Sequence, residues 1–238
     1  MPETFVLVHG AWHGGWVWDG VVKELEAAGH KALAPTLAGM APGDDRAKVT
    51  FDAIIDSLAT VLAAQSEPVV LVGHSSAGFV LQTVAARVPE KLKRIVFLNA
   101  FILPDGTCQF DLVPPEASQG MTVAAQASPD NCVPVIEEFV RDQLMPGDSK
   151  EAQDALLARL SPQPLALFTT PINARAFAQV NVPKTVVFCR DDASLPPGAF
   201  QGMVQALGEC RVIEIPGGHE LLFIDPTAVA KALLEAVA

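Results

Sequence analysis

The most informative segment of the chain is Val69-Val70-Leu71-Val72-Gly73-His74-Ser75-Ser76-Ala77-Gly78-Phe79-Val80. Its consecutive aliphatic residues predict a strand buried on both faces, as in a parallel sheet covered by helices. The small residues that follow predict a tight turn and a helix that begins at Ser75 or Ser76. On such a turn a serine hydroxyl is held above the carboxyl edge of the sheet, where it can act as a nucleophile. A simple helix-capping turn is the alternative interpretation.

Similar aliphatic runs recur along the chain and alternate with amphipathic segments. The predicted strands are Phe5–Val8, Lys31–Ala34, Val69–Val72, Ile95–Leu98, Thr185–Cys189 and Val212–Ile215, and the predicted helices include Val17–Ala28, Asp52–Ala64 and Thr227–Val237. This alternation predicts an α/β fold with a doubly wound, mostly parallel sheet.

The alternation breaks between Pro104 and Val182. Ten of the 19 prolines fall between Pro104 and Pro183, and only two helical patterns, Val135–Leu144 and Lys150–Leu160, survive there. No good strand pattern is present in this segment. We therefore expect residues 104–182 to form a helical cap inserted into a core domain made of residues 1–103 and 183–238.

Composition excludes several classes of function. The 238 residues carry 16 Lys and Arg against 27 Asp and Glu, a net charge of −11, and show no basic cluster. Such a chain is repelled by nucleic acids and anionic membranes. No apolar run approaches the roughly 18–20 residues that span a bilayer. The four cysteines lack metal-ligand spacing, so we expect free thiols, no metal and a cytoplasmic protein.

A serine nucleophile needs a base and an acid. His219 is the best candidate base because it follows a late strand, in the flexible turn Gly217-Gly218-His219. The acid is expected among Asp191 and Asp192, just past the Thr185–Cys189 strand. Neighbouring residues of an extended loop point apart, so only one of them can face the histidine, and we favour Asp192. The order Ser, Asp, His is the order that this turn architecture uses.

Acyl transfer also needs two N–H groups aimed at the developing oxyanion. The segment His9-Gly10-Ala11-Trp12-His13-Gly14-Gly15-Trp16 ends a strand and enters a glycine-rich loop. It can supply the N–H of Ala11, and Ser76 can supply the second donor. Trp12 and His13 are candidates for binding substrate, although packing in the core or cap is the alternative for the tryptophan.

With these motifs the chain resembles the α/β-hydrolase superfamily over almost its full length. More narrowly, it resembles the plant methylesterase and hydroxynitrile lyase group and its bacterial esterase relatives. The motifs that carry the resemblance are His9-Gly10-Ala11-Trp12-His13-Gly14-Gly15-Trp16-Val17-Trp18, Leu25-Glu26-Ala27-Ala28-Gly29-His30-Lys31, Gly73-His74-Ser75-Ser76-Ala77-Gly78, Asp192-Ala193-Ser194-Leu195-Pro196 and Gly217-Gly218-His219. The resemblance implies a triad of Ser75, His219 and Asp192, since the family pattern places the acid shortly before Leu195-Pro196.

Two departures argue against a cyanohydrin lyase. Hydroxynitrile lyases of this group carry a lysine after the catalytic histidine, where this chain has Glu220, and a threonine in the oxyanion loop, where it has Ala11. An anion beside a departing cyanide is electrostatically unfavourable.

We therefore expect a serine hydrolase that cleaves a small, largely apolar ester without a cofactor. A cofactor-free dioxygenase or a C–C bond hydrolase or lyase on the same scaffold is one alternative. A small-molecule receptor with little turnover is another. The expected partner is a small-molecule ester, and a homodimer is possible.

Overall fold

A computed structural model describes all residues, 1–238, and its centre is a six-stranded sheet with the order β2-β1-β3-β4-β7-β8. All five strand pairs in this sheet are parallel. The strands are β1 (Thr4–Val8), β2 (Lys31–Leu33), β3 (Val69–His74), β4 (Leu92–Leu98), β7 (Lys184–Cys189) and β8 (Arg211–Ile215). Each predicted strand is present, with ends that differ by a few residues, so the prediction of an α/β fold with a parallel sheet is confirmed.

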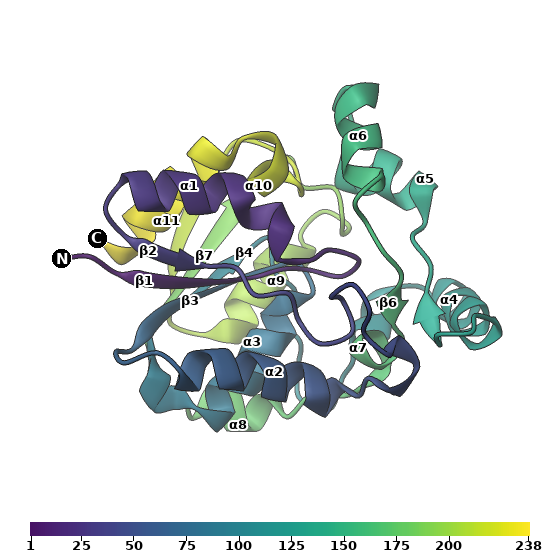
Figure 1. Cartoon of the computed structure of the whole chain (residues 1–238), viewed down its shortest axis with the longest axis horizontal. Helices are drawn as coiled ribbons and strands as arrows, with labels where there is room; N and C mark the ends of the chain where they lie inside the picture. Colours follow the sequence, from purple (N-terminus) through teal and green to yellow (C-terminus); the bar gives the residue numbers. More distant parts are fainter.

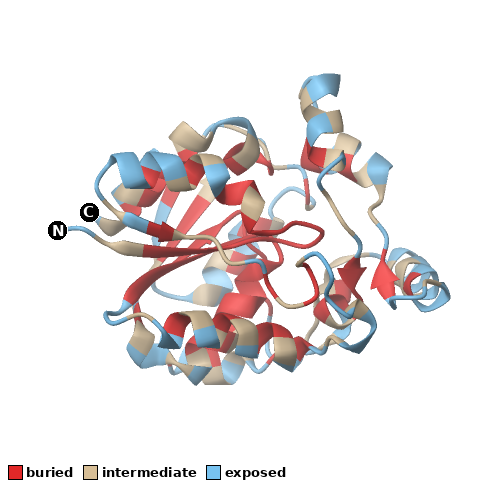
Figure 2. Ribbon diagram, viewed as in Figure 1, coloured by how far each residue is buried: buried red, intermediate tan, exposed pale blue.

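Helices cover both faces of the sheet (Figure 1). One face carries α1 (Asp19–Ala27), α10 (Leu221–Ile224) and α11 (Pro226–Val237), and the other carries α2 (Phe51–Ala63), α3 (Ala77–Arg87), α8 (Ala174–Ala178) and α9 (Ala199–Leu207). Successive side chains of a strand point to opposite faces. Phe5 and Leu7 of β1 accordingly join one buried cluster, whereas Val6 and Val8 join the other. Figure 2 shows that buried residues fill the strands of the sheet and the inner sides of the helices.

The chain between β4 and β7 builds a separate group of short elements. They are η4 (Gln109–Leu112), α4 (Pro115–Ala127), β5 (Cys132–Val133), α5 (Glu137–Phe139), the π-helical turn η5 (Val140–Leu144), α6 (Lys150–Leu157), β6 (Gln163–Pro164) and α7 (Ala166–Thr169), followed by α8. In Figure 1, α4, α5 and α6 project at one end of the molecule, whereas α8 lies against α3. The remaining short 3-10 turns are η1 (Gly15–Trp18), η2 (Arg46–Lys48) and η3 (Pro89–Lys91).

The expectation that this segment has no strand is wrong. β5 and β6 pair antiparallel, with Cys132 opposite Pro164 and Val133 opposite Gln163. Strands of two residues are too short to show the alternation by which a sequence predicts a strand.

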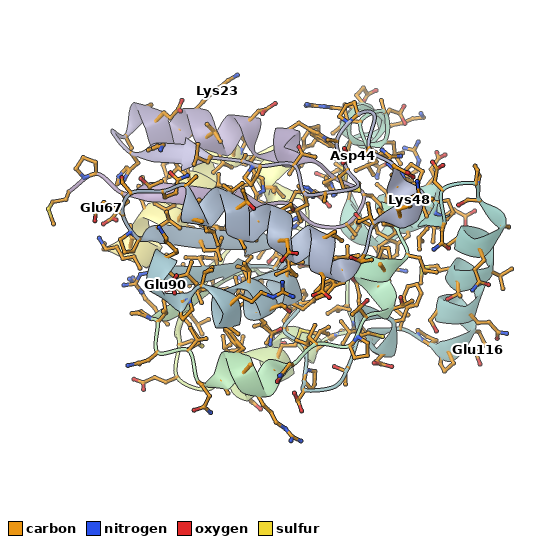
Figure 3. The ribbon with its side chains drawn as sticks, turned by 60° about the horizontal axis from the view of Figure 1, so that its bottom comes forward. Lys23, Asp44, Lys48, Glu67, Glu90 and Glu116 are labelled. Carbon is orange, nitrogen blue, oxygen red and sulfur yellow. The ribbon has the colours of Figure 1, made fainter.

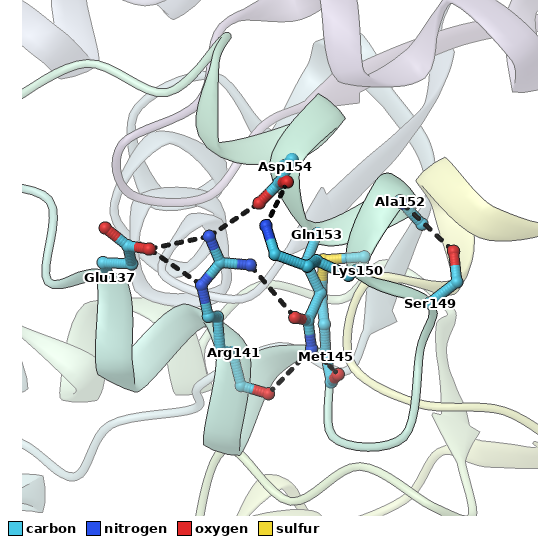
Figure 4. A network of polar contacts seen from close by, with 8 residues as sticks. All are labelled: Glu137, Arg141, Met145, Ser149, Lys150, Ala152, Gln153 and Asp154. Carbon is cyan, nitrogen blue, oxygen red and sulfur yellow. Dashed lines mark hydrogen bonds and ion pairs between the residues drawn. The ribbon is translucent and has the colours of Figure 1, made fainter.

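Side-chain contacts join the projecting elements (Figure 4). The guanidinium of Arg141 forms ion pairs with Glu137 and, across to α6, with Asp154, each at 2.7 Å. Gln153 donates to the carbonyl of Met145 at 2.9 Å. The contacts fix α6 against the turn η5.

Most charged side chains lie on the outside of the molecule. The six labelled in Figure 3 are all exposed: Lys23, Asp44, Lys48, Glu67, Glu90 and Glu116. No helix is both long enough and apolar enough to cross a membrane.

Candidate active site

Ser75 lies on the sharp turn between β3 and α3, as predicted. Its φ of 56° is in the left-handed region, which a residue inside an α-helix does not adopt. Ser76 is the N-cap, and α3 begins at Ala77 rather than at Ser75 or Ser76. The carbonyl of Ser75 accepts hydrogen bonds from Gly78 and Phe101, both at 2.9 Å. These two bonds hold the strained turn in place.

The crowding in this turn falls on Gly78. A Cβ on Gly78 would lie 2.3 Å from the carbonyl oxygen of Phe101, far inside van der Waals contact. A Cβ on Gly73 would lie 3.1 Å from the methyl group of Ala77. The turn therefore accepts alanine at position 77, because the missing side chains of Gly73 and Gly78 leave room for the Ala77 methyl group and the Phe101 carbonyl.

His219 and Asp192 form a buried pair. His219 Nδ1 donates to Asp192 Oδ2 at 2.7 Å, and the other carboxylate oxygen accepts from the backbone N–H of Ser194 at 2.8 Å. The exposed Asp191 instead accepts from the N–H of Gly217 at 3.0 Å and so holds the loop that carries the histidine. Of the two adjacent carboxylates, Asp192 is thus the one that contacts His219.

The charges of this pair shift both pKa values. Burial alone would lower the pKa of His219, but the charge and hydrogen bond of Asp192, with a smaller contribution from Glu220, raise it above its usual value. Burial would raise the pKa of Asp192, yet His219 and Ser194 together lower it. The aspartate is therefore ionised and orients an imidazole whose Nδ1 carries a proton.

One cavity of about 650 Å³ brings most of the predicted site residues together. Ser75, Ser76, Ala11, Trp12, His13 and His219 all line it, together with the apolar residues Phe101, Phe110, Val113, Met121, Ile136, Phe139, Leu144 and Phe168. Asp192 lies behind His219 and does not line it. No hydrogen bond joins the hydroxyl of Ser75 to His219, a separation common in enzymes without bound substrate.

The two expected oxyanion donors are free. The N–H groups of Ala11 and Ser76 donate to no acceptor within the protein. The carbonyl of Gly10, in the peptide that carries the Ala11 N–H, accepts from His9 Nδ1 at 2.8 Å. His9 Nε2 in turn accepts from the N–H of Leu37 at 3.0 Å. Burial lowers the pKa of His9 to about 4, so this histidine is neutral and its tautomer is fixed.

Trp12 and His13 line the cavity, and each donates one ring N–H to a backbone carbonyl. The indole N–H of Trp12 donates to the carbonyl of Val133 at 3.2 Å. His13 Nδ1 donates to the carbonyl of Ala11 at 2.7 Å, and its Nε2 lies 3.4 Å from Glu220 Oε2. Trp12 can therefore offer a substrate only its ring, whereas His13 Nε2 has no hydrogen-bond partner in the protein.

The sequence did not predict the buried group of His13, His74 and Glu220 beside His219. Burial would raise the pKa of Glu220, but His13 and the neighbouring histidines lower it to about 2. His74 Nε2 donates to the carbonyl of His219 at 3.0 Å. His74, His219 and Glu220 each place a potential metal ligand within 4.8 Å of the others, although Asp192 and the backbone already engage both histidines. The only signal in the sequence was Glu220 itself, directly after the candidate base.

Comparisons with known proteins agree along the whole chain. Residues 5–232 match the model of the Alpha/beta hydrolase family. The chain is 28% identical to a carbendazim hydrolyzing esterase of Nocardioides sp., covering 97% of this chain and 98% of that protein. It is 31% identical to salicylic acid-binding protein 2 of Nicotiana tabacum, covering 98% and 96%.

Other relatives and a solved structure extend the likeness. Methylesterase 1 and alpha-hydroxynitrile lyase, both of Arabidopsis thaliana, are each 28% identical to this chain, over 98% and 92% of it. An extracellular alpha/beta-hydrolase from a Paenibacillus species superposes with a TM-score of 0.92 at 29% identity, covering 99% of each chain. The expected resemblance to the methylesterase and hydroxynitrile lyase group is confirmed. The chain belongs to the alpha/beta hydrolase family.

Proposed function

We propose that the protein is a carboxylic ester hydrolase in which Ser75 is the nucleophile, His219 the base and Asp192 the acid. One observation carries the proposal. A strained serine lines the same cavity as a histidine that a buried aspartate holds, and as two residues whose N–H groups have no acceptor in the protein. Whole-length relatives named as esterases support the same reaction.

The first half-reaction forms an acyl-enzyme. His219 Nε2 takes the proton of the Ser75 hydroxyl as the oxygen attacks the ester carbonyl. The carbonyl oxygen becomes an oxyanion, which accepts hydrogen bonds from Ala11 and Ser76. When this intermediate collapses, the ester C–O bond breaks and His219 returns the proton to the leaving alcohol. Each oxyanion donor contributes about 10²–10³ to kcat in comparable enzymes.

The second half-reaction releases the acid. His219 takes a proton from water, the resulting hydroxide attacks the acyl carbonyl, and the same two N–H groups bind the oxyanion. The bond to the serine then breaks, the carboxylic acid leaves and Ser75 regains its proton. Neither half-reaction needs a metal or an organic cofactor.

The cavity supports an apolar, uncharged substrate. Its wall is largely aliphatic and aromatic, and most of these side chains come from residues 104–182, which we propose as a cap over Ser75. The charged residues that line the cavity, histidines aside, are Glu138, Asp142 and Glu220, with no lysine or arginine. An anionic ester would therefore meet carboxylates without a compensating cation.

Glu220 also bears on the lyase alternative. Its carboxylate is buried beside His219, and its pKa near 2 keeps it ionised. A departing cyanide would face a negative charge there, so ester hydrolysis is the reaction that this site favours.

We also propose that the protein is cytoplasmic and forms a homodimer. All four cysteines are unpaired, which supports a reducing compartment such as the cytoplasm. A homodimer stays a prediction that analytical ultracentrifugation of the purified protein can test.

The experiment is p-nitrophenol release from acetyl to octanoyl esters by the wild type and Ser75→Ala, without added cofactor. We expect turnover by the wild type, loss of at least about 10³-fold in the variant, and a chain-length preference set by the cavity. An inert wild type, or a variant of equal activity, would overturn the proposal. Tests of oxygen-dependent chemistry and of ligand binding would then follow.

A further inference from the structure

Trp12 has a strained backbone beside the proposed oxyanion hole. Its φ of 64° lies in the left-handed region, where a bulky residue is a genuine outlier, and it directly follows Ala11. Such a conformation persists only where surrounding contacts hold it. The contacts of Trp12 therefore show what shapes this loop.

The hydrogen-bonding groups of Trp12 are all held by residues between β4 and β7. Its backbone N–H donates to Gln163 Oε1 at 3.1 Å, and its carbonyl accepts from the N–H of Ser161 at 2.9 Å. Its indole N–H donates to the carbonyl of Val133. Val133 and Gln163 lie directly opposite each other in the β5–β6 ladder. One cross-strand pair therefore binds both the backbone N–H and the indole N–H of Trp12.

The peptide between Ala11 and Trp12 is fixed at both edges. Its carbonyl accepts from His13 Nδ1 at 2.7 Å, and its N–H donates to Gln163. A peptide group is planar, so two opposed hydrogen bonds fix its orientation. The neighbouring peptide, whose carbonyl His9 holds, then presents the N–H of Ala11 to the cavity without a partner.

We infer that Gln163 is a positioning residue for ester hydrolysis, because it holds Trp12 in its strained conformation and thereby aims the Ala11 N–H at the oxyanion. The β5–β6 ladder, whose residues do not line the cavity, thus acts on the site through Trp12. The inference rests on the proposed function.

Removal of the acceptor gives a specific kinetic signature. Gln163 is only 2% exposed, so its loss leaves the buried N–H of Trp12 without a partner. The loop then relaxes and the Ala11 donor moves. Since the oxyanion exists only in the transition state and the intermediates, we expect kcat to fall while KM stays nearly constant. A displaced donor costs between about 10-fold and 10²-fold.

The test compares Gln163→Leu, which removes the acceptor, with Gln163→Glu, which keeps an oxygen at the same position. Each variant is assayed for kcat, KM and the affinity of a trifluoromethyl ketone, whose adduct with a serine carries an oxyanion. Ser128→Ala is the control for a weakened ladder. It removes the hydroxyl that accepts from the N–H of Cys132 at 3.0 Å and contacts neither Trp12 nor the cavity.

We expect Gln163→Leu to lower kcat and ketone affinity by the same factor, Gln163→Glu to retain most of both, and Ser128→Ala to lower the melting temperature only. Should Gln163→Leu not fold, Gln163→Asn, which is one methylene too short, replaces it. A folded variant with normal kcat and ketone affinity, or with a change in KM alone, would overturn the inference. A wild type that hydrolyses no ester would instead overturn the proposed function.

Discussion

Asp192 and Asp191 are adjacent carboxylates with different partners. The carboxylate of Asp192 contacts the imidazole of His219 and is buried, whereas Asp191 is exposed and its carboxylate accepts from the backbone N–H of Gly217. The sequence could place both at the end of a strand and expect only one to face the histidine. The contact that separates them depends on the path of the loop that returns after β8, which no local pattern specifies.

This difference predicts a pH dependence. The base must be neutral, and Asp192 raises the pKa of His219, so kcat/KM falls as the pH drops through a value above the usual imidazole pKa of about 6.5. In Asp192→Asn the raising charge is gone, so this acid limb moves to lower pH and kcat drops by about 10⁴-fold. A pH–rate profile checks both. The matched control, Asp191→Asn, should leave the limb in place, and equal shifts in the two variants would contradict the assignment.

The charge of Glu220 predicts a second, smaller shift in the pH dependence. Its negative charge also raises the pKa of His219. Replacement by glutamine keeps the shape and removes the charge, so the acid limb of Glu220→Gln should move to lower pH, by less than that of Asp192→Asn. The same pH–rate profile measures it. A limb that moves to higher pH would show that the carboxylate does not act through charge.

Among the secondary-structure elements, every strand of the central sheet was predicted from an aliphatic run, because strands buried on both faces need continuous apolar residues. The β5–β6 ladder escaped prediction since two-residue strands carry no periodicity. The buried His13–Glu220 contact also escaped, because it joins residues from opposite ends of the chain. The residues of the proposed triad could be located from motifs, whereas their supporting contacts required the fold.

The turn between β3 and α3 gives a prediction about packing. In Gly78→Ala the added methyl group would meet the carbonyl of Phe101, so we expect a loss of about 1–3 kcal/mol in the free energy of unfolding and a lower kcat. Ala77→Gly should cost no more than about 1 kcal/mol, from helix propensity alone. Urea denaturation and steady-state kinetics measure both effects. Equal costs for the two substitutions would mean that Gly78 is not the crowded position.

The whole molecule carries a net charge of −11, and the carboxylates of Glu138 and Asp142 line the proposed substrate cavity. The field of such a surface lowers the local concentration of anions. We expect a succinate hemiester to have a kcat/KM roughly tenfold or more below that of its uncharged isostere. The ratio between the two kcat/KM values should become smaller at high salt, because the Debye length falls to about 3 Å at an ionic strength of 1 M.

The variants Glu138→Gln and Asp142→Asn test whether the carboxylates in the cavity or the net charge of the molecule sets the preference for the uncharged ester. If the cavity carboxylates set the preference, these substitutions narrow the gap between the two esters. Glu67→Gln removes an equal charge on an exposed residue that does not line the cavity and should change nothing. An unchanged ratio in the cavity variants, or an equal change in Glu67→Gln, would assign the preference to the molecule as a whole.

The proposed mechanism requires Ser75 to form a covalent acyl intermediate. Mass spectrometry of the protein after treatment with a fluorophosphonate, followed by peptide mapping, tests it most directly, because such reagents trap activated serine nucleophiles. We predict one adduct, on the peptide that carries Ser75, formed in proportion to the loss of esterase activity. The adduct should be absent from Ser75→Ala and should form much more slowly in Asp192→Asn. An adduct on another residue, or full loss of activity without modification of Ser75, would contradict the account.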